Sequence, residues 1–193
     1  MIKRLLLILT FFGGLFSANL TMAAAPSPNG NILDLKLKDG DVKIQLLPDL
    51  APKHVARIKQ LVADKAYDNV VFHRVIDGFM AQTGDVKFGK KGSSFYNIQL
   101  AGMGGSKYPN LPAEFSKTPF LRGVVGMARS SDPNSANSQF FICFKEASFL
   151  NGQYTVVGRV IDGMQYVDNI KKGDASNNGA VTDPDVIIKA SIL

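Results

Sequence analysis

Short runs of alternating apolar and polar residues recur along most of this chain, and they constrain its fold more than any other feature. The first two runs, 32–37 and 42–46, flank the dipeptide Asp39-Gly40, which is typical of a two-residue β-hairpin turn. Further strands are expected at 70–76, 79–83, 123–128, 138–144, 154–160 and 186–193. Many short strands with few helices predict a mainly β chain, folded as an antiparallel barrel or sandwich.

Two helices are expected between these strands. Pro52 suits the first turn of a helix, where its missing N–H would have no partner. The apolar residues after it recur at the spacing of one helical face and are Val55, Ile58, Leu61 and Val62. A helix is therefore expected at 52–65, and a second one at 164–170. Residues 84–112 are rich in Gly, Ser, Lys and Asn and predict one long structured loop.

Residues 1–24 have the three-part composition of a secretory signal peptide. Lys3 and Arg4 form a basic start, residues 5–16 are apolar apart from one threonine, and small residues follow. This apolar run is shorter than the roughly 20 residues that a transmembrane helix needs, so cleavage is favoured over a retained anchor. No cysteine lies near the cut, so a lipoprotein anchor is excluded.

The cut is expected after residue 23 or 24, while a cut after residue 25 would put Pro26 at the first mature position. Residues 25–31 would then be a flexible mature N-terminus, followed by one folded domain at 32–193. A periplasmic protein with no stable membrane insertion after cleavage is expected. The formal net charge of +6 includes Lys3 and Arg4, so the mature chain carries +4.

The polar and sulfur-containing residues exclude several kinds of site. The basic residues are scattered without the stripe or patch of a nucleic-acid-binding surface, so no nucleic acid is expected as a partner. Cys143 is the only cysteine, which excludes an intramolecular disulfide, and its apolar neighbours predict a buried strand position. No group of His, Cys, Asp and Glu has metal-ligand spacing. Neither a metal nor another cofactor is expected.

Two segments resemble the active-site motifs of the cyclophilin-type peptidyl-prolyl cis/trans isomerases. Residues 72–85 read FHRVIDGFMAQTGD, and residues 126–129 read GMAR before NSQFFI at 137–142. The resemblance runs in order from about Ile32 to Leu193, and the style of the leader and loops points to an exported bacterial member. It implies an eight-stranded antiparallel β-barrel capped by two α-helices, with the active site on the outer face of the barrel.

The resemblance also implies the residues of that site. Arg74 would donate a hydrogen bond to the prolyl nitrogen of an X–Pro bond, and Gln82 would bind the substrate backbone. The catalytic residues implied in this way are Arg74, Gln82 and Phe79. The residues implied to line the proline pocket or contact substrate are Met80, Ala128, Arg129, Gln139, Phe140, Phe141, Phe149, Leu150 and Tyr154.

This sequence departs from the family pattern at a few of these positions. Phe149 stands where many members have Trp, Tyr154 where many have His, and Arg129 where many have Asn. Phenylalanine lacks the indole N–H through which the family's tryptophan bonds to cyclosporin, so weak cyclosporin binding is expected. Asp77 replaces a frequent proline in the turn between two strands.

The two histidines are given structural roles. His54 is expected on the surface or packed against its helix, and His73 is expected to point away from Arg74 because neighbouring side chains alternate along a strand. Three classes of function are open. The favoured one is a monomeric catalyst that assists the folding of exported, proline-containing polypeptides. The others are a non-catalytic binding module or chaperone that uses the same groove, and a structural protein of an envelope complex.

Overall fold

A computed structural model describes residues 30–193 of the chain. The predicted signal peptide and most of the predicted mature N-terminus lie outside these residues. The strands are β1 (Ile32–Lys36), β2 (Asp41–Leu46), β3 (Val70–Val71), β4 (Arg74–Ile76), β5 (Met80–Thr83), β6 (Val124–Met127), β7 (Phe140–Cys143), β8 (Val156–Asp162), β9 (Val186–Ile187) and β10 (Lys189–Ile192). The α-helices are α1 (Pro52–Ala63) and α2 (Met164–Asp168), and the short 3-10 helices are η1 (Ser148–Leu150) and η2 (Ala175–Asn177).

Eight of the strands form one curled antiparallel sheet in the order β10-β1-β2-β8-β6-β7-β5-β4. β3 and β9 form a separate antiparallel pair. Since β3 leads into β4 and β9 leads into β10, this pair lies between the two edge strands of the sheet and connects them. The predicted mainly β fold with two helices is confirmed.

The single strands expected at 70–76 and 186–193 are each divided in two. At the first break, the N–H of Phe72 donates to the carbonyl of Asp185, and the chain passes from its pairing with β9 to its pairing with β5. At the second break, the N–H of Ile188 donates to Lys36, and the chain passes from β3 to β1. An apolar run does not reveal a change of partner, so the sequence predicted each pair of strands as one.

Helix α1 starts at Pro52 as predicted and ends two residues early, at Ala63. Ala51 supplies no side-chain cap, and the carboxylate of Glu114 instead accepts hydrogen bonds from the backbone N–H groups of Lys53 and His54. The fully buried ring of His54 also lies 2.6 Å from Glu114, from Nδ1 to Oε2. Of the two positions expected for His54, surface or helix packing, the buried packing position is the one observed.

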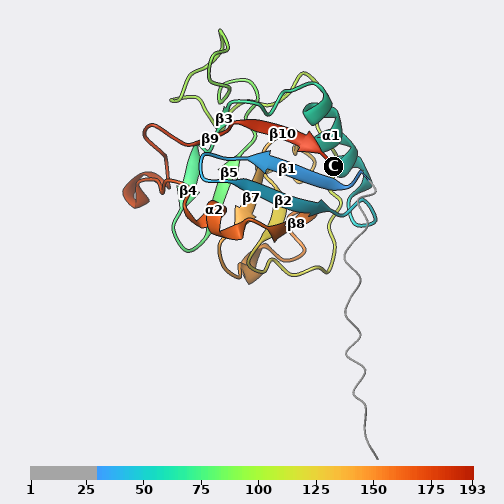
Figure 1. The fold of residues 1–193 in the computed structure, drawn as a ribbon. Helices are drawn as coiled ribbons and strands as arrows, with labels where there is room; N and C mark the ends of the chain where they lie inside the picture. Colours follow the sequence, from blue (N-terminus) through green and yellow to red (C-terminus); the bar gives the residue numbers. More distant parts are fainter. Residues whose placement is uncertain (1–29) are drawn as a thin grey trace, which may run out of the picture.

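The helices lie on opposite sides of the β1–β2 hairpin in Figure 1. α1 contacts β10, while α2 contacts β2 and ends at Asp168, short of the predicted residue 170. Within residues 30–193, the structure contains no helix with the length and apolar character needed to cross a bilayer.

Alternation along the strands creates two apolar clusters on opposite faces of the sheet. The larger cluster fills the inner face and includes Val75, Ala81, Val125, Phe140, Ile142 and Val157. A smaller cluster on the outer face contains Met80, Phe120, Phe141, Cys143, Ala147, Leu150 and Val156. Cys143 is fully buried there, as predicted, and burial raises the pKa of its thiol to about 12. This outer cluster is the platform for the site described below.

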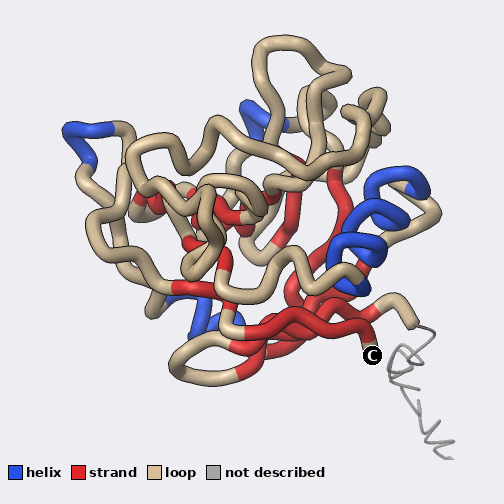
Figure 2. The backbone as a smooth tube through the Cα atoms, turned by 90° about the horizontal axis from the view of Figure 1, so that it is seen from above, coloured by secondary structure: helices blue, strands red, loops and turns tan. Residues whose placement is uncertain are grey.

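The long connection between β5 and β6 contains no helix or strand, in line with the predicted loop (Figure 2). Its first part is organised by Asp85, which is fully buried. The carboxylate accepts hydrogen bonds from the backbone N–H groups of Lys87, Phe88, Gly102 and Gly104, at 2.8–3.0 Å. One acidic side chain therefore holds two distant parts of the loop together.

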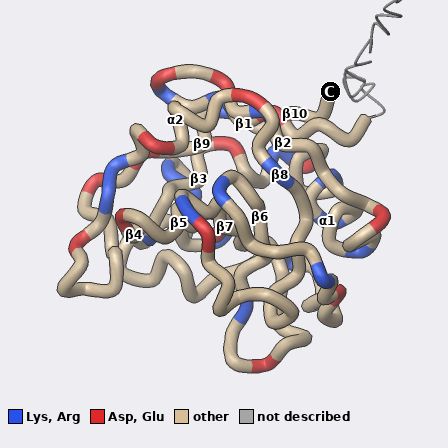
Figure 3. Tube along the Cα trace, turned by 90° about the horizontal axis from the view of Figure 1, so that it is seen from below, with Lys and Arg blue, Asp and Glu red and all other residues tan. Residues whose placement is uncertain are grey.

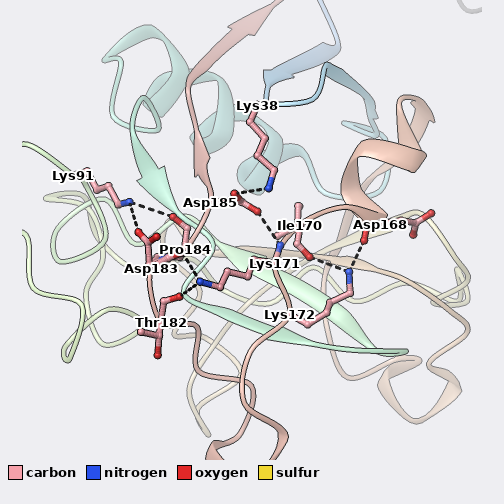
Figure 4. A network of polar contacts seen from close by, with 10 residues as sticks. All are labelled: Lys38, Lys91, Asp168, Ile170, Lys171, Lys172, Thr182, Asp183, Pro184 and Asp185. Atoms are coloured by element: carbon pink, nitrogen blue, oxygen red, sulfur yellow. Dashed lines mark hydrogen bonds and ion pairs between the residues drawn. The ribbon is translucent and has the colours of Figure 1, made fainter.

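Residues 171–185 form a second long connection, and polar contacts close it where its two ends meet, which we call its neck (Figure 4). The N–H of Lys171 donates to the carboxylate of Asp185 at 2.8 Å, and the Lys171 ammonium donates to the carbonyls of Thr182 and Asp183. Asp185 is also paired with Lys38 of the β1–β2 turn at 3.0 Å. Elsewhere, cationic and anionic residues are interspersed around the molecule (Figure 3).

Candidate active site

A row of directly paired residues crosses the outer face of the sheet. Arg74 of β4 is paired with Gln82 of β5, which is paired with Phe141 of β7, which is paired with Gly126 of β6. Directly opposite residues in neighbouring antiparallel strands point to the same face. The sheet register therefore places a guanidinium, an amide and an aromatic ring side by side, with a glycine beyond them.

This row borders an open cavity of about 400 Å³. Its lining residues are Arg74, Phe79, Met80, Gln82, Ala128, Arg129, Phe141, Phe149, Leu150, Gln153 and Tyr154. Ten of these eleven residues belong to the set implied by the sequence motifs, although they come from segments up to 80 positions apart. The structure thus brings most of the predicted site residues together around one hollow.

The Arg74 guanidinium is held from two sides at the rim of the cavity. Its Nη1 donates to Oε1 of Gln82 at 3.3 Å. On the other side, Nε donates to the backbone carbonyl of Asn178 at 3.0 Å, and Nη2 donates to the Asn178 side-chain oxygen at 2.9 Å. Burial lowers the pKa of Arg74, but a guanidinium keeps its charge in proteins. The cavity therefore has an oriented cationic donor at this rim, beside the side chains of Phe79, Met80 and Phe141.

Gln82 connects this arginine to a second cavity. Its Nε2 donates to Oε1 of Gln139 at 3.0 Å, and Nε2 of Gln139 donates to the carbonyls of Gly102 and Gly104 at 2.9 and 2.7 Å. Gln139 lines the second cavity, of about 340 Å³, and not the first. Because Gln82 uses its side-chain nitrogen to donate to Gln139, its side-chain oxygen is turned toward Arg74, from which it accepts a hydrogen bond.

Aromatic rings form the floor and one wall of the first cavity. Phe141 stacks on Phe120 with ring centroids 5.7 Å apart, and Tyr154 meets Phe141 edge-on at 5.8 Å. Phe79 and Phe149 lie 5.3 Å apart. Phe149 remains 65% exposed, so it forms an outer edge of the hollow and not its base. This surface has the size and chemistry to hold a small apolar ring.

Arg129 braces the wall opposite Arg74. Its guanidinium lies 4.5 Å from the Tyr154 ring centroid and donates twice to the carbonyl of Gln153, at 3.1 and 2.9 Å. Its Nη1 also donates to the backbone carbonyls of Ser130 and Ser131. Most donors of Arg129 are thus used within the protein, which assigns its side chain to supporting the segment that carries Tyr154.

One prediction needs correction in this region, and the reasoning behind another, that His73 points away from Arg74, does not apply. Phe140 was expected in the pocket, but it is fully buried on the inner face and packs edge-on against Tyr67. Its neighbour Phe141 takes the outer position, because consecutive residues of β7 face opposite sides. His73 lies in the break between β3 and β4, so strand alternation does not orient it. It is buried close to Gly102, and burial lowers its pKa to about 4.

Two residues of the site were not predicted. Gln153 lines the cavity and holds Arg129, and Asn178 holds Arg74. The dipeptide Asn178-Gly179 is a recognisable turn sequence, but a turn signal does not show which distant residue it contacts. Within residues 30–193, no group of three or more His, Cys, Asp or Glu side chains is placed to bind a metal ion.

Comparisons with known proteins identify close similarities. Residues 32–192 match the family model described as cyclophilin type peptidyl-prolyl cis-trans isomerase/CLD. A probable peptidyl-prolyl cis-trans isomerase of Brucella suis is 65% identical over 170 residues, which cover 88% of this chain and 86% of that protein. Peptidyl-prolyl cis-trans isomerase-like 3 of Gallus gallus is 40% identical over 134 residues, covering 69% of this chain and 77% of that protein.

Solved structures show the same similarity. Cyclophilin AquaCyp293 from Hirschia baltica superposes with a TM-score of 0.70 at 26% identity, covering 84% of this chain and 74% of that one. A cyclophilin type peptidyl-prolyl cis-trans isomerase of Cryptosporidium parvum, crystallised in the presence of the dipeptide Ala-Pro, also has a TM-score of 0.70. It is 28% identical and covers 84% of this chain and 98% of that one.

Proposed function

This chain belongs to the cyclophilin family of peptidyl-prolyl cis-trans isomerases, and from that premise we propose that Arg74 and the aromatic-floored cavity beside it catalyse X–Pro rotation together. The observation that carries the proposal is the placement of Arg74. Its guanidinium is clamped at the rim of a hollow whose floor is aromatic, and it lines that hollow together with Gln82. The substrate class is a polypeptide that contains proline.

The chemistry to be performed is rotation and not bond cleavage. Amide resonance opposes it with a barrier of roughly 18–20 kcal/mol. Resonance is lost as the prolyl nitrogen becomes pyramidal and its lone pair localises, and a donor aimed at that nitrogen stabilises the twisted state. Arginine suits this role because it is permanently charged and presents its donors in a rigid fork.

The cavity contributes the rest of the proposed stabilisation of the twisted amide. Phe79, Met80 and Phe141 enclose an apolar space that would hold the pyrrolidine ring while the preceding carbonyl turns. A twisted amide is less polar than a planar one, so removing water from it favours the transition state over the ground state. Gln82 would bind the backbone of the substrate and fix its register, since it lines both cavities.

The first test is isomerase activity on a short Xaa-Pro peptide, measured for the purified protein and for Arg74→Ala. One hydrogen bond from a charged donor stabilises by about 1.5–3 kcal/mol, so kcat/KM should fall by roughly one to two decades. Arg74→Lys keeps the charge but loses the fork, and it should recover only part of the activity.

Arg159→Ala is the matched control, because Arg159 is an exposed arginine of β8 that does not line the cavity. This variant should behave like the wild type. A folded Arg74→Ala protein with wild-type kcat/KM would contradict the mechanism. A folded wild type without activity would instead make the groove a binding surface for proline-containing chains.

We also propose that the clients are exported polypeptides that fold after crossing the inner membrane. Support comes from the basic, apolar and small-residue composition of residues 1–24. Slow X–Pro isomerisation limits folding once a chain is released, so a catalyst in the same compartment would act there. N-terminal sequencing of the protein from a periplasmic fraction should find a start at residue 24 or 25, and an intact Met1 would contradict export by cleavage.

A further inference from the structure

We propose that Asn178 is a positioning residue, which sets the orientation of the Arg74 guanidinium for X–Pro rotation. The inference rests on the function proposed for Arg74. Asn178 is 104 positions further along the chain, yet it accepts two hydrogen bonds from that guanidinium. Its backbone carbonyl accepts from Nε at 3.0 Å, and its side-chain oxygen accepts from Nη2 at 2.9 Å.

The two bonds to Asn178 fix the orientation of the Arg74 guanidinium, which the single bond to Gln82 cannot fix alone. A guanidinium held only through Nη1 could still pivot about that single contact. With Nε and Nη2 also bound to one residue, the plane of the group is defined by three bonds from two sides. Nη1 also lies 4.0 Å from Sδ of Met80, and the second N–H of Nη2 is left for the substrate. An orientation that is fixed before the substrate binds costs nothing further at the transition state.

Asn178 is itself held by the backbone around it. The loop that carries it docks along the edge of β4: Val75 donates its N–H to the carbonyl of Gly179, and Gly173 donates to the carbonyl of Val75, both at 2.8 Å. A side chain at Gly179 would lie 2.5 Å from Ile76, so the loop and the strand are in close contact. The closed neck formed by Lys171 and Asp185 anchors both ends of the segment (Figure 4).

The conformation of Asn178 explains why an asparagine suits this position. Its φ of 51° lies in the left-handed region, which asparagine, aspartate and glycine adopt more readily than other residues. Glycine would keep the backbone and its carbonyl but lose the side-chain acceptor. Aspartate would keep an acceptor of the same size. Substitutions at this one position can therefore separate the hydrogen bond from backbone strain.

The experiment compares Asn178→Gly and Asn178→Asp with the wild type in the peptide isomerase assay. Asn178→Gly should lower kcat about tenfold, the effect of one lost charged hydrogen bond, while KM stays close to the wild-type value. Asn178→Asp should restore most of kcat. Asn177→Gly, the same substitution one residue earlier at a side chain that makes no bond to Arg74, should leave both constants unchanged.

A spectroscopic readout tests the clamp without relying on turnover. The Arg74 Nε–H proton should exchange slowly with water in the wild type and in Asn178→Asp, because it is bound to the Asn178 carbonyl. Asn178→Gly keeps the carbonyl that binds Nε but removes the acceptor of Nη2, so the guanidinium can swing about its Nε contact and this exchange should accelerate. In an Arg74→Lys background, Asn178→Gly should have no further effect on kcat, since the fork that Asn178 orients is gone.

The outcomes separate this inference from the proposed function. An active wild type with unchanged kcat and unchanged Nε–H exchange in Asn178→Gly would overturn the positioning role and leave the function of Arg74 intact. Equal losses in Asn177→Gly and Asn178→Gly would also overturn it, by showing general damage to the loop. A wild type without isomerase activity would overturn the proposed function, and the positioning role with it.

Discussion

Gly126 lies so close to the aromatic floor of the cavity that there is no room for a side chain at this position. A Cβ atom there would lie 2.5 Å from Cζ of Phe141 and 2.6 Å from Cε1 of Phe120. Gly126→Ala should therefore push Phe141 toward the cavity, raising KM for an Xaa-Pro peptide and lowering the free energy of unfolding by about 1–3 kcal/mol. Steady-state kinetics and urea denaturation measure the two effects.

A second substitution controls for the first. Phe120 stacks behind Phe141 in the buried outer cluster and does not line the cavity, so Phe120→Leu makes room without touching the substrate. In the double variant with Gly126→Ala, Phe141 can shift back, and part of the lost affinity should return. If KM of the double variant were simply the product of the two single effects, displacement of Phe141 would not be the cause.

At the level of elements, the segment 171–185 is joined to the body by a neck in which one carboxylate makes two different contacts. Asp185 accepts the Lys171 backbone N–H and pairs with the half-exposed ammonium of Lys38. Asp185→Ala removes both contacts and should cost about 1 kcal/mol, mostly through the lost backbone bond. Lys38→Ala removes the exposed ion pair alone and should cost about 0.5 kcal/mol or less.

Amide hydrogen exchange would show where this stability is lost. Opening the neck should accelerate exchange at Gly173 and Val75, whose N–H groups join the segment to β4. Strands on the far side of the sheet, such as β1 and β2, should keep their protection. Equal destabilisation by Asp185→Ala and Lys38→Ala would instead assign the effect to the ion pair.

The elements themselves were predicted well where their signals are local. The β1–β2 hairpin and the start of α1 follow from a turn dipeptide and a proline, both of which act on neighbouring residues. The strand breaks at Phe72 and Ile188 were missed because they come from a change of pairing partner far along the chain. The cap of α1 was missed for the same reason, since Glu114 lies about 60 positions away.

For the whole molecule, the motif implied most of the residues around the cavity but not the contacts that orient them. Residues such as Arg74 and Gln82 lie in one short segment, where a local sequence motif identifies them directly. Phe140 was misplaced because two adjacent phenylalanines look alike in sequence, and only the register of β7 decides which one faces outward. Asn178 and Gln153 depend on tertiary contacts, which no local pattern encodes.

Acid should weaken the whole fold through His73. Its buried ring has a pKa lowered by burial to about 4, against about 6.5 for an unfolded chain, although nearby Asp85 opposes the shift. Between these values the unfolded state binds more protons than the native state, so the free energy of unfolding falls as the pH is lowered. The loss should be about 2 kcal/mol between pH 7.5 and pH 5, and about 3 kcal/mol once both states are protonated.

Urea denaturation of the wild type and of His73→Gln across pH 5–7.5 measures this contribution. The variant cannot take up the proton, so its free energy of unfolding should depend less on pH, even if its stability at pH 7.5 is lower. His54, the other histidine of the chain, also has a pKa lowered by burial and will leave a residual slope in both proteins. The difference between the two slopes therefore isolates His73, and identical slopes would show that its ring is not held neutral by the fold.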